Sequence, residues 1–133
     1  MRLVICLYEQ AIEDVRRAVI AMEKGHIEVR THNINHALAV IAQLQGSLDM
    51  ERGGEVAKNL HRFYNVVRGG LVEAQLKQSA RILEQQISYL VLVYESWMEA
   101  ERLAQAPQPQ PVEPAEAAQA MTPLAIPMGN WKA

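Results

Sequence analysis

Apolar residues recur at spacings of three and four through residues 1–104, which is typical of amphipathic helices that bury one face. Short polar or glycine-containing stretches divide this pattern into four segments, at Gly25, at Asp49–Gly54 and at Lys77–Ser79. Ser79 has the hydroxyl that commonly caps the start of a helix. Because short connections make consecutive helices antiparallel, the sequence predicts an all-α fold, an antiparallel up-down-up-down four-helix bundle.

The C-terminal part of the chain differs sharply in composition. All six prolines lie beyond residue 106, in a segment rich in proline, alanine and glutamine. Such a segment buries too little apolar surface to offset the entropy lost on ordering. We therefore predict a helical-bundle domain at residues 1–104 and a disordered tail at 105–133. Two interpretations of the tail stay open, a solubilising extension or a segment whose apolar stretch "MTPLAIPMGNW" folds back over a groove in the bundle.

Charge and hydropathy narrow the class of protein. The net charge of −2 shows no excess of basic residues of the kind that nucleic-acid-binding proteins carry. No apolar run approaches the ~18–20 residues of a membrane span. The single cysteine, Cys6, excludes an internal disulfide, fits a reducing compartment and is predicted to be a small buried hydrophobic residue. The sequence thus predicts a protein of the cytoplasm that binds neither nucleic acid nor membranes.

Two adjacent glycines raise the question of a phosphate-binding loop. Such a loop needs a lysine and a hydroxyl after its last glycine, and it follows a strand. Here Glu55 follows Gly54, and no strand is predicted. We interpret Asp49, Gly53, Gly54 and Glu55 as a structural turn, in which the glycines accept conformations closed to other residues and Glu55 complements the dipole of the next helix.

Catalytic and metal-binding patterns are weak. His32 and His36 lie one turn apart with Glu28 a turn earlier, but di-metal bundles use two inward Glu-x-x-His pairs, which this sequence lacks. His32 and His36 are expected on a solvated or rim face. Serines lack a nucleophile-elbow motif, and Cys6 has no evident base. The sequence predicts no metal, no cofactor and no enzymatic activity.

The apolar faces exceed what a small bundle needs for its core. Residues 3–8 are apolar nearly all round, and the fourth segment offers Tyr89, Val93 and Trp97 beyond its main stripe. A domain of this size buries only about two-thirds of its surface, so part of this surplus is expected to stay open. Surplus apolar surface on a helical bundle favours a groove that receives an amphipathic helix from a partner. The other interpretation, that each of these residues belongs to the core, stays open.

Three stretches carry a family resemblance: "LVICLYEQAI", "INHALAVIAQLQGSLDMERGGEVAKNLHRFY" and "LVEAQLKQS". Over residues 3–100 the sequence resembles the FliS family of flagellar export chaperones. The resemblance implies a cytosolic bacterial protein that binds the C-terminal helical segment of flagellin, prevents its premature polymerisation and delivers it to the flagellar type III export apparatus. It also suggests an export-gate protein and an anti-sigma factor as partners. The residues expected to form the groove or the packing beneath it are Tyr8, Ile12, Leu38, Ile41, Leu44, Leu60 and Tyr64.

The sequence also departs from the family pattern. Family members usually carry a segment before the opening helix that can cover the groove, whereas this sequence opens almost directly with that helix. Gly69 and Gly70 occupy the interior of the third helix and are expected to soften it, at ~1 kcal/mol each relative to alanine. The alternative hypothesis is a regulatory helical-bundle adaptor that binds an anti-sigma factor or another disordered secreted substrate.

Overall fold

The computed structural model describes residues 2–105, which form four helices and no strand. They are α1 (Arg2–Lys24), α2 (Ile27–Gly46), α3 (Gly54–Lys77) and α4 (Ala80–Gln105). The predicted all-α four-helix fold is therefore confirmed. The predicted tail, apart from its first residue at the end of α4, lies outside the described residues.

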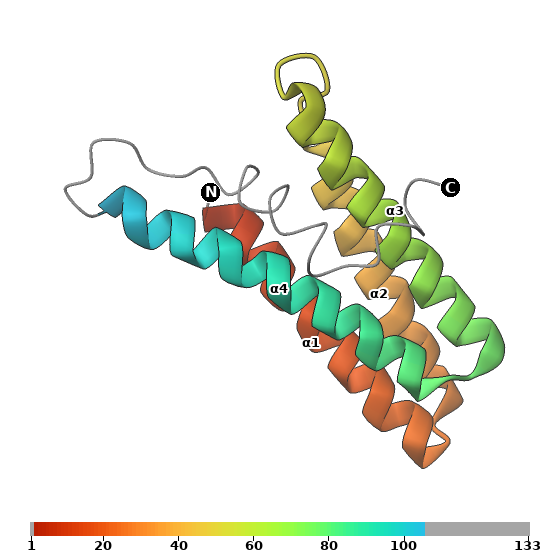
Figure 1. Cartoon of the computed structure of the whole chain (residues 1–133). Coiled ribbons are helices and arrows are strands. Elements are labelled where there is room, and N and C mark those ends of the chain that lie inside the picture. Colours follow the sequence, from red (N-terminus) through yellow and green to blue (C-terminus); the bar gives the residue numbers. More distant parts are fainter. Residues whose placement is uncertain (1, 106–133) are drawn as a thin grey trace.

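The helices form a ring in chain order. Each helix packs against the next one, and α4 packs against α1, whereas the backbones of the diagonal pairs, α1 with α3 and α2 with α4, do not meet. Each helix runs back alongside its predecessor (Figure 1). The α1–α4 pair and the α2–α3 pair lie close together at the end that carries the α1–α2 and α3–α4 turns, here called the closed end. They diverge toward the end that carries the α2–α3 loop, here called the open end (Figure 1).

Left-handed residues end two of the helices at the closed end. Gly25, with φ of 74°, follows α1, and Gln78, with φ of 52°, follows α3. A glycine adopts this conformation without steric cost, whereas Gln78 is an exception that the sequence did not indicate. The Ser79 hydroxyl then accepts a hydrogen bond of 3.2 Å from the backbone N–H of Ile82, so the predicted cap of α4 is confirmed.

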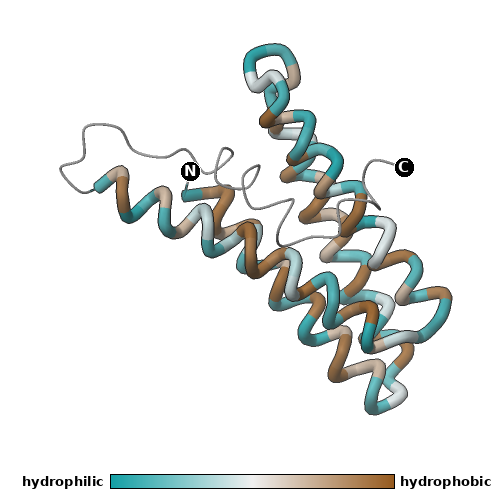
Figure 2. Tube along the Cα trace, in the orientation of Figure 1, coloured by the Kyte–Doolittle hydropathy of each residue, from teal (hydrophilic) through white to brown (hydrophobic). Residues whose placement is uncertain are grey.

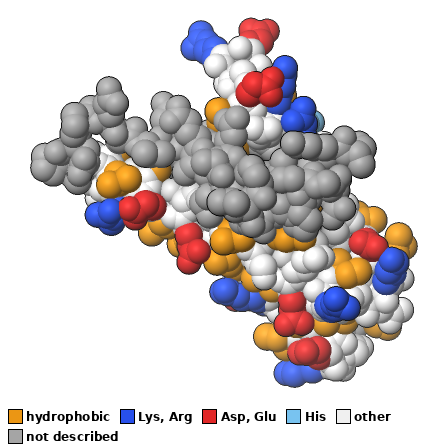
Figure 3. Space-filling view, in the orientation of Figure 1, with side chains coloured by type: hydrophobic (Ala, Val, Ile, Leu, Met, Phe, Trp, Pro, Cys, Tyr) orange, Lys and Arg blue, Asp and Glu red, His pale blue; other side chains and the backbone are white. Residues whose placement is uncertain are grey.

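The core lies between the four helices and is mainly aliphatic. Hydrophobic positions alternate with hydrophilic ones along each helix, and the tip of the α2–α3 loop is hydrophilic (Figure 2). Charged side chains of both signs project from that tip (Figure 3). The largest fully buried side chains are Tyr8, Tyr64, Phe63, Ile34, Ile41, Leu44, Leu71, Leu83 and Leu90. This arrangement is the expected consequence of packing four amphipathic faces together.

The structure shows which apolar side chains of the fourth segment belong to the core, and it corrects the expectation for Cys6. Tyr89 and Val93 are buried in the core, as one of the two interpretations expected, whereas Trp97 is half-buried. Cys6 is exposed, because Ile5 and Tyr8 occupy the buried face of α1 and the intervening position turns away from it. A continuous apolar run does not reveal which of its members faces inward.

A buried carboxylate links α1 to α2. Asp14 is only 2% exposed. One of its oxygens accepts a hydrogen bond of 2.9 Å from Nε2 of Gln10, and the other lies 2.5 Å from Nδ1 of His36. His36 was expected on a solvated or rim face, and its side chain is indeed 49% exposed. Its ring nitrogen nevertheless provides a hydrogen-bond partner for a buried carboxyl oxygen, which explains why Asp14 is tolerated in the interior.

Gly70 on α3 lies against the side chain of Gln86 on α4. A Cβ atom at Gly70 would collide with the side-chain amide of Gln86, whereas a Cβ at Gly69 would meet nothing within 4 Å. α3 continues unbroken through both glycines. The helix-weakening residue at position 70 therefore has a packing role, because it leaves room for a buried side chain of α4.

Candidate functional site

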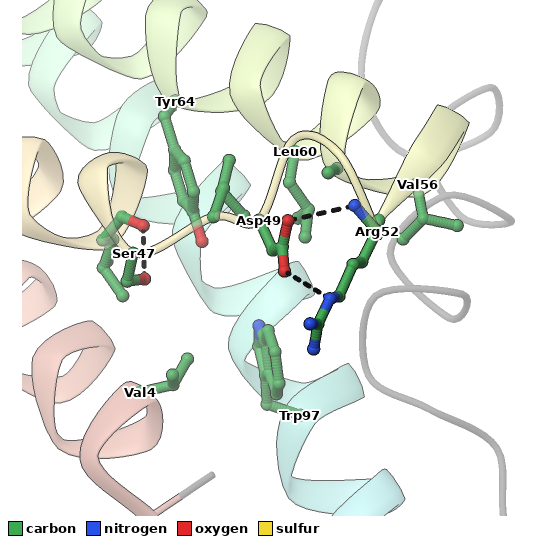
Figure 4. A pocket seen from close by; sticks show the side chains of 12 residues that line it. Val4, Ser47, Asp49, Arg52, Val56, Leu60, Tyr64 and Trp97 are labelled. Atoms are coloured by element: carbon green, nitrogen blue, oxygen red, sulfur yellow. Dashed lines mark hydrogen bonds and ion pairs between the residues drawn. The ribbon is translucent and has the colours of Figure 1, made fainter.

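An apolar cavity of about 410 Å³ at the open end is the main candidate site among the described residues. All four helices and the α2–α3 loop contribute to it (Figure 4). Its volume lies within the range of ~300–1,000 Å³ that is usual for ligand-binding clefts. Its lining residues are Val4, Leu44, Ser47, Leu48, Asp49, Arg52, Gly53, Val56, Ala57, Leu60, Tyr64 and Trp97.

Asp49 organises the loop that forms one wall of the cavity. Its Oδ1 accepts hydrogen bonds from the backbone N–H groups of Glu51 (3.2 Å) and Arg52 (3.0 Å), and its carbonyl oxygen accepts one of 2.8 Å from Gly53. Its Oδ2 lies 3.8 Å from Nε of Arg52, whose side chain extends over the cavity (Figure 4). A short polar side chain that bonds the backbone ahead of it is a common device for fixing a turn.

The two glycines of this turn are required for different reasons. At Gly53, a Cβ atom would lie 2.7 Å from the carbonyl oxygen of Asp49 and 2.5 Å from Cβ of Ala57. At Gly54, the space around a Cβ is free, but φ is +55°, a conformation that L-residues rarely adopt. Glu55 lies in the first turn of α3, as expected from its charge. The glycine pair thus shapes the cavity wall.

A pair of tyrosines forms the polar floor next to the cavity. The hydroxyl groups of Tyr8 on α1 and Tyr64 on α3 lie 2.8 Å apart and join diagonal helices whose backbones do not touch. The ring of Trp97 lies 6.3 Å from that of Tyr8. Burial raises the pKa of Tyr64 to about 12. Burial, reinforced by the neighbouring Tyr64 hydroxyl and opposed by the indole N–H of Trp97, raises the pKa of Tyr8 well above 10.

The structure brings together some of the seven groove residues expected from the sequence. Those that line the cavity are Leu44, Leu60 and Tyr64. Those that are buried in the core without lining it are Tyr8, Ile12 and Ile41, and Leu38 is half-buried against the core. The sequence therefore indicated residues of the cavity together with residues of the packing beneath it.

Several lining residues escaped the groove assignment made from the sequence. Leu48 and Val56 flank the loop, Val4 lies at the start of α1, and Arg52 lies over the opening. Leu48 and Val56 could have been predicted from the sequence, because they are apolar residues on either side of the glycine turn. Val4 and Trp97 meet the loop only through the tertiary arrangement, although the surplus apolar face of the fourth segment did include Trp97.

The potential metal-ligating side chains of the described residues are dispersed over the helices. Within residues 2–105, His, Cys, Asp and Glu side chains do not gather in groups of three or more that could hold a metal ion. His32 stacks on His36 at 6.5 Å, which leaves the two rings as neighbours on the face of α2. None of the helices α1 to α4 combines the length and apolar character that a bilayer span requires.

The fold class is thus an all-α four-helix bundle with an apolar cavity at its open end. The family model described as "Flagellar protein FliS" matches residues 1–104, and the chain belongs to this family. The resemblance found in the sequence is thereby confirmed, and the family is one of flagellar secretion chaperones.

Named relatives support the same assignment. The flagellar secretion chaperone FliSB of Pseudomonas aeruginosa is 34% identical over 96 residues, which cover 72% of this chain and 76% of the relative. The flagellar secretion chaperone FliS of Vibrio cholerae is 30% identical over 96 residues, covering 72% and 71%. That of Salmonella typhimurium is 29% identical over 97 residues, covering 72% of each chain.

Proposed function

We propose that this protein binds the C-terminal helical segment of flagellin in the bacterial cytosol, prevents its premature polymerisation and delivers it to the flagellar type III export apparatus. The proposal rests on membership of the family together with the open-end cavity. A segment that is disordered alone can bury its apolar face against such a cavity and become helical there.

The cavity is the observation that carries the proposal. Its walls come from all four helices, and its apolar side chains include Leu48, Val56 and Trp97, which remain partly exposed. An amphipathic helix presents apolar side chains at intervals of three and four residues, so side chains from one of its faces can pack against this cavity together. The exposed Arg52 at the rim provides a charge that can select the polar face of the bound helix.

Two further partners are proposed from the family resemblance alone, an export-gate protein and an anti-sigma factor. The alternative function, a regulatory adaptor for an anti-sigma factor or another disordered secreted substrate, would use the same cavity. Competition between candidate segments for the cavity separates the two functions. The first proposal requires that flagellin bind more tightly than the others.

Isothermal titration calorimetry with a synthetic flagellin C-terminal segment tests the proposal. We expect binding with a negative heat-capacity change and a gain in helical circular dichroism. Val56→Asp, which places a charge in the cavity, is expected to weaken binding by about tenfold or more, which corresponds to about 1.4 kcal/mol. The matched control is Val72→Asp, because Val72 lies on the same helix, is 46% exposed and does not line the cavity. Equal affinity of the two variants, or no binding of the segment, would contradict the proposal.

A further inference from the structure

A second cavity lies at the closed end, between the end of α1 and the start of α2. Its volume is about 210 Å³. Its apolar part is made by Ile20, Ala21 and Val29, and the side chains of Ile20 and Val29 are 52% and 50% exposed. Large aliphatic side chains left half in water on adjacent helices form a surface that a partner can cover favourably.

Every charged or titratable side chain that lines this cavity is basic. These side chains belong to Arg17, Lys24 and His26. Arg17 is 3.2 Å from a carboxylate oxygen of Glu13 on its own helix, whereas Lys24 and His26 have no ion pair through their side chains within residues 2–105. The nearby acidic residues Glu23 and Glu28 do not line the cavity. An apolar floor with a basic rim is complementary to a surface that combines apolar and acidic side chains.

We propose that the closed-end cavity docks an acidic amphipathic helix of a partner protein. Apolar side chains of that helix cover Ile20 and Val29, while its carboxylates face Lys24 and Arg17. The site is formed by the α1–α2 turn region, and the open-end cavity lies at the other end of the bundle. Both surfaces can therefore be occupied at once, and the second site does not depend on the function proposed for the first.

The test uses a fluorescein-labelled synthetic helix with leucine at every third or fourth position and glutamate elsewhere, titrated with the full chain and followed by anisotropy. The same helix with lysine in place of glutamate is the probe control. We expect the acidic helix to bind at least about tenfold more tightly than the basic one, and Lys24→Glu to remove about tenfold of that affinity. Arg62→Glu makes the same charge change at an exposed position of α3 that does not line the closed-end cavity, and should change affinity less than about twofold.

The affinity of the Lys24→Glu variant for the flagellin segment should equal that of the unmodified chain, which separates this site from the open-end cavity. Equal binding of acidic and basic helices would overturn the proposal. Equal losses in Lys24→Glu and Arg62→Glu would also overturn it, because they would show a general charge effect without a docking site.

Discussion

The glycine pair of the α2–α3 turn offers the sharpest test of how this loop is built. Gly53→Ala would place a methyl group 2.7 Å from the carbonyl oxygen of Asp49 and 2.5 Å from Cβ of Ala57. The carbonyl cannot retreat without stretching the 2.8 Å hydrogen bond that it accepts from Gly53. Gly54→Ala meets no atom but forces alanine to adopt φ of +55°. The two substitutions therefore destabilise the fold by different mechanisms.

The magnitudes follow from these mechanisms. Overpacking against backbone should lower the free energy of unfolding of Gly53→Ala by about 1–3 kcal/mol. The left-handed conformation costs alanine about 1–2 kcal/mol, and the reduced entropy of the unfolded chain returns about 0.4–1 kcal/mol, so Gly54→Ala should lose roughly 1 kcal/mol. Gly46→Ala is the control, because a Cβ at Gly46 meets nothing and φ is not positive. It should be neutral or slightly stabilising.

Urea denaturation followed by circular dichroism measures these effects. With a slope of about 1–3 kcal/mol per molar urea, a loss of 2 kcal/mol moves the midpoint down by about 1 M. Flagellin-segment affinity should fall for Gly53→Ala, because this residue lines the cavity. A Gly53→Ala variant that is as stable as the Gly46→Ala variant would refute the steric reasoning. Unchanged stability with lost binding would instead identify the turn as a direct contact.

Two further predictions concern the interior of the bundle. Gly69→Ala should stabilise the protein by about 0.5–1 kcal/mol, whereas Gly70→Ala should destabilise it by displacing the buried amide of Gln86; effects of the same sign in urea denaturation would contradict this. Burial raises the pKa of Tyr8 well above 10 and that of Tyr64 to about 12 in the folded protein. As the pH rises above about 10, both tyrosines therefore ionise more readily in the unfolded chain than in the folded protein. The free energy of unfolding should thus be constant below pH 10 with respect to these groups and should fall as the pH rises toward about 12. Between pH 9 and 11, the urea midpoint should fall less steeply with pH in the Tyr64→Phe variant than in the unmodified protein. Equal pH dependence of the two midpoints would count against this explanation.

Local signals made much of the fold predictable. The spacing of apolar residues, the glycine at position 25 and the hydroxyl of Ser79 each act within one or two helical turns, and the structure has four helices with the corresponding ends. Gln78 in a left-handed conformation was missed because nothing in its own side chain favours it. The sequence therefore predicted where the third helix ends, but it did not predict that Gln78 would adopt the left-handed conformation there.

Contacts between distant segments were not predictable in the same way. The pairing of Asp14 with His36 and the fit of Gln86 against Gly70 depend on which faces meet after the helices associate. The residues that line the candidate cavity likewise include some that a local pattern predicts and some that only the tertiary arrangement brings there. Leu60 follows from the apolar stripe of its helix, whereas the contribution of Trp97 depends on how α4 lies relative to the loop.

The fluorescence of Trp97 reports whether flagellin's terminal segment enters the open-end cavity. The chain has two tryptophans, so Trp131→Phe leaves Trp97, which lines the cavity, as the only reporter. Titration with the flagellin C-terminal segment should shift Trp97 emission to shorter wavelength and saturate with the same affinity as the calorimetric binding curve. Calorimetric binding that leaves the emission of Trp97 unchanged would contradict the account, because the segment would then bind elsewhere.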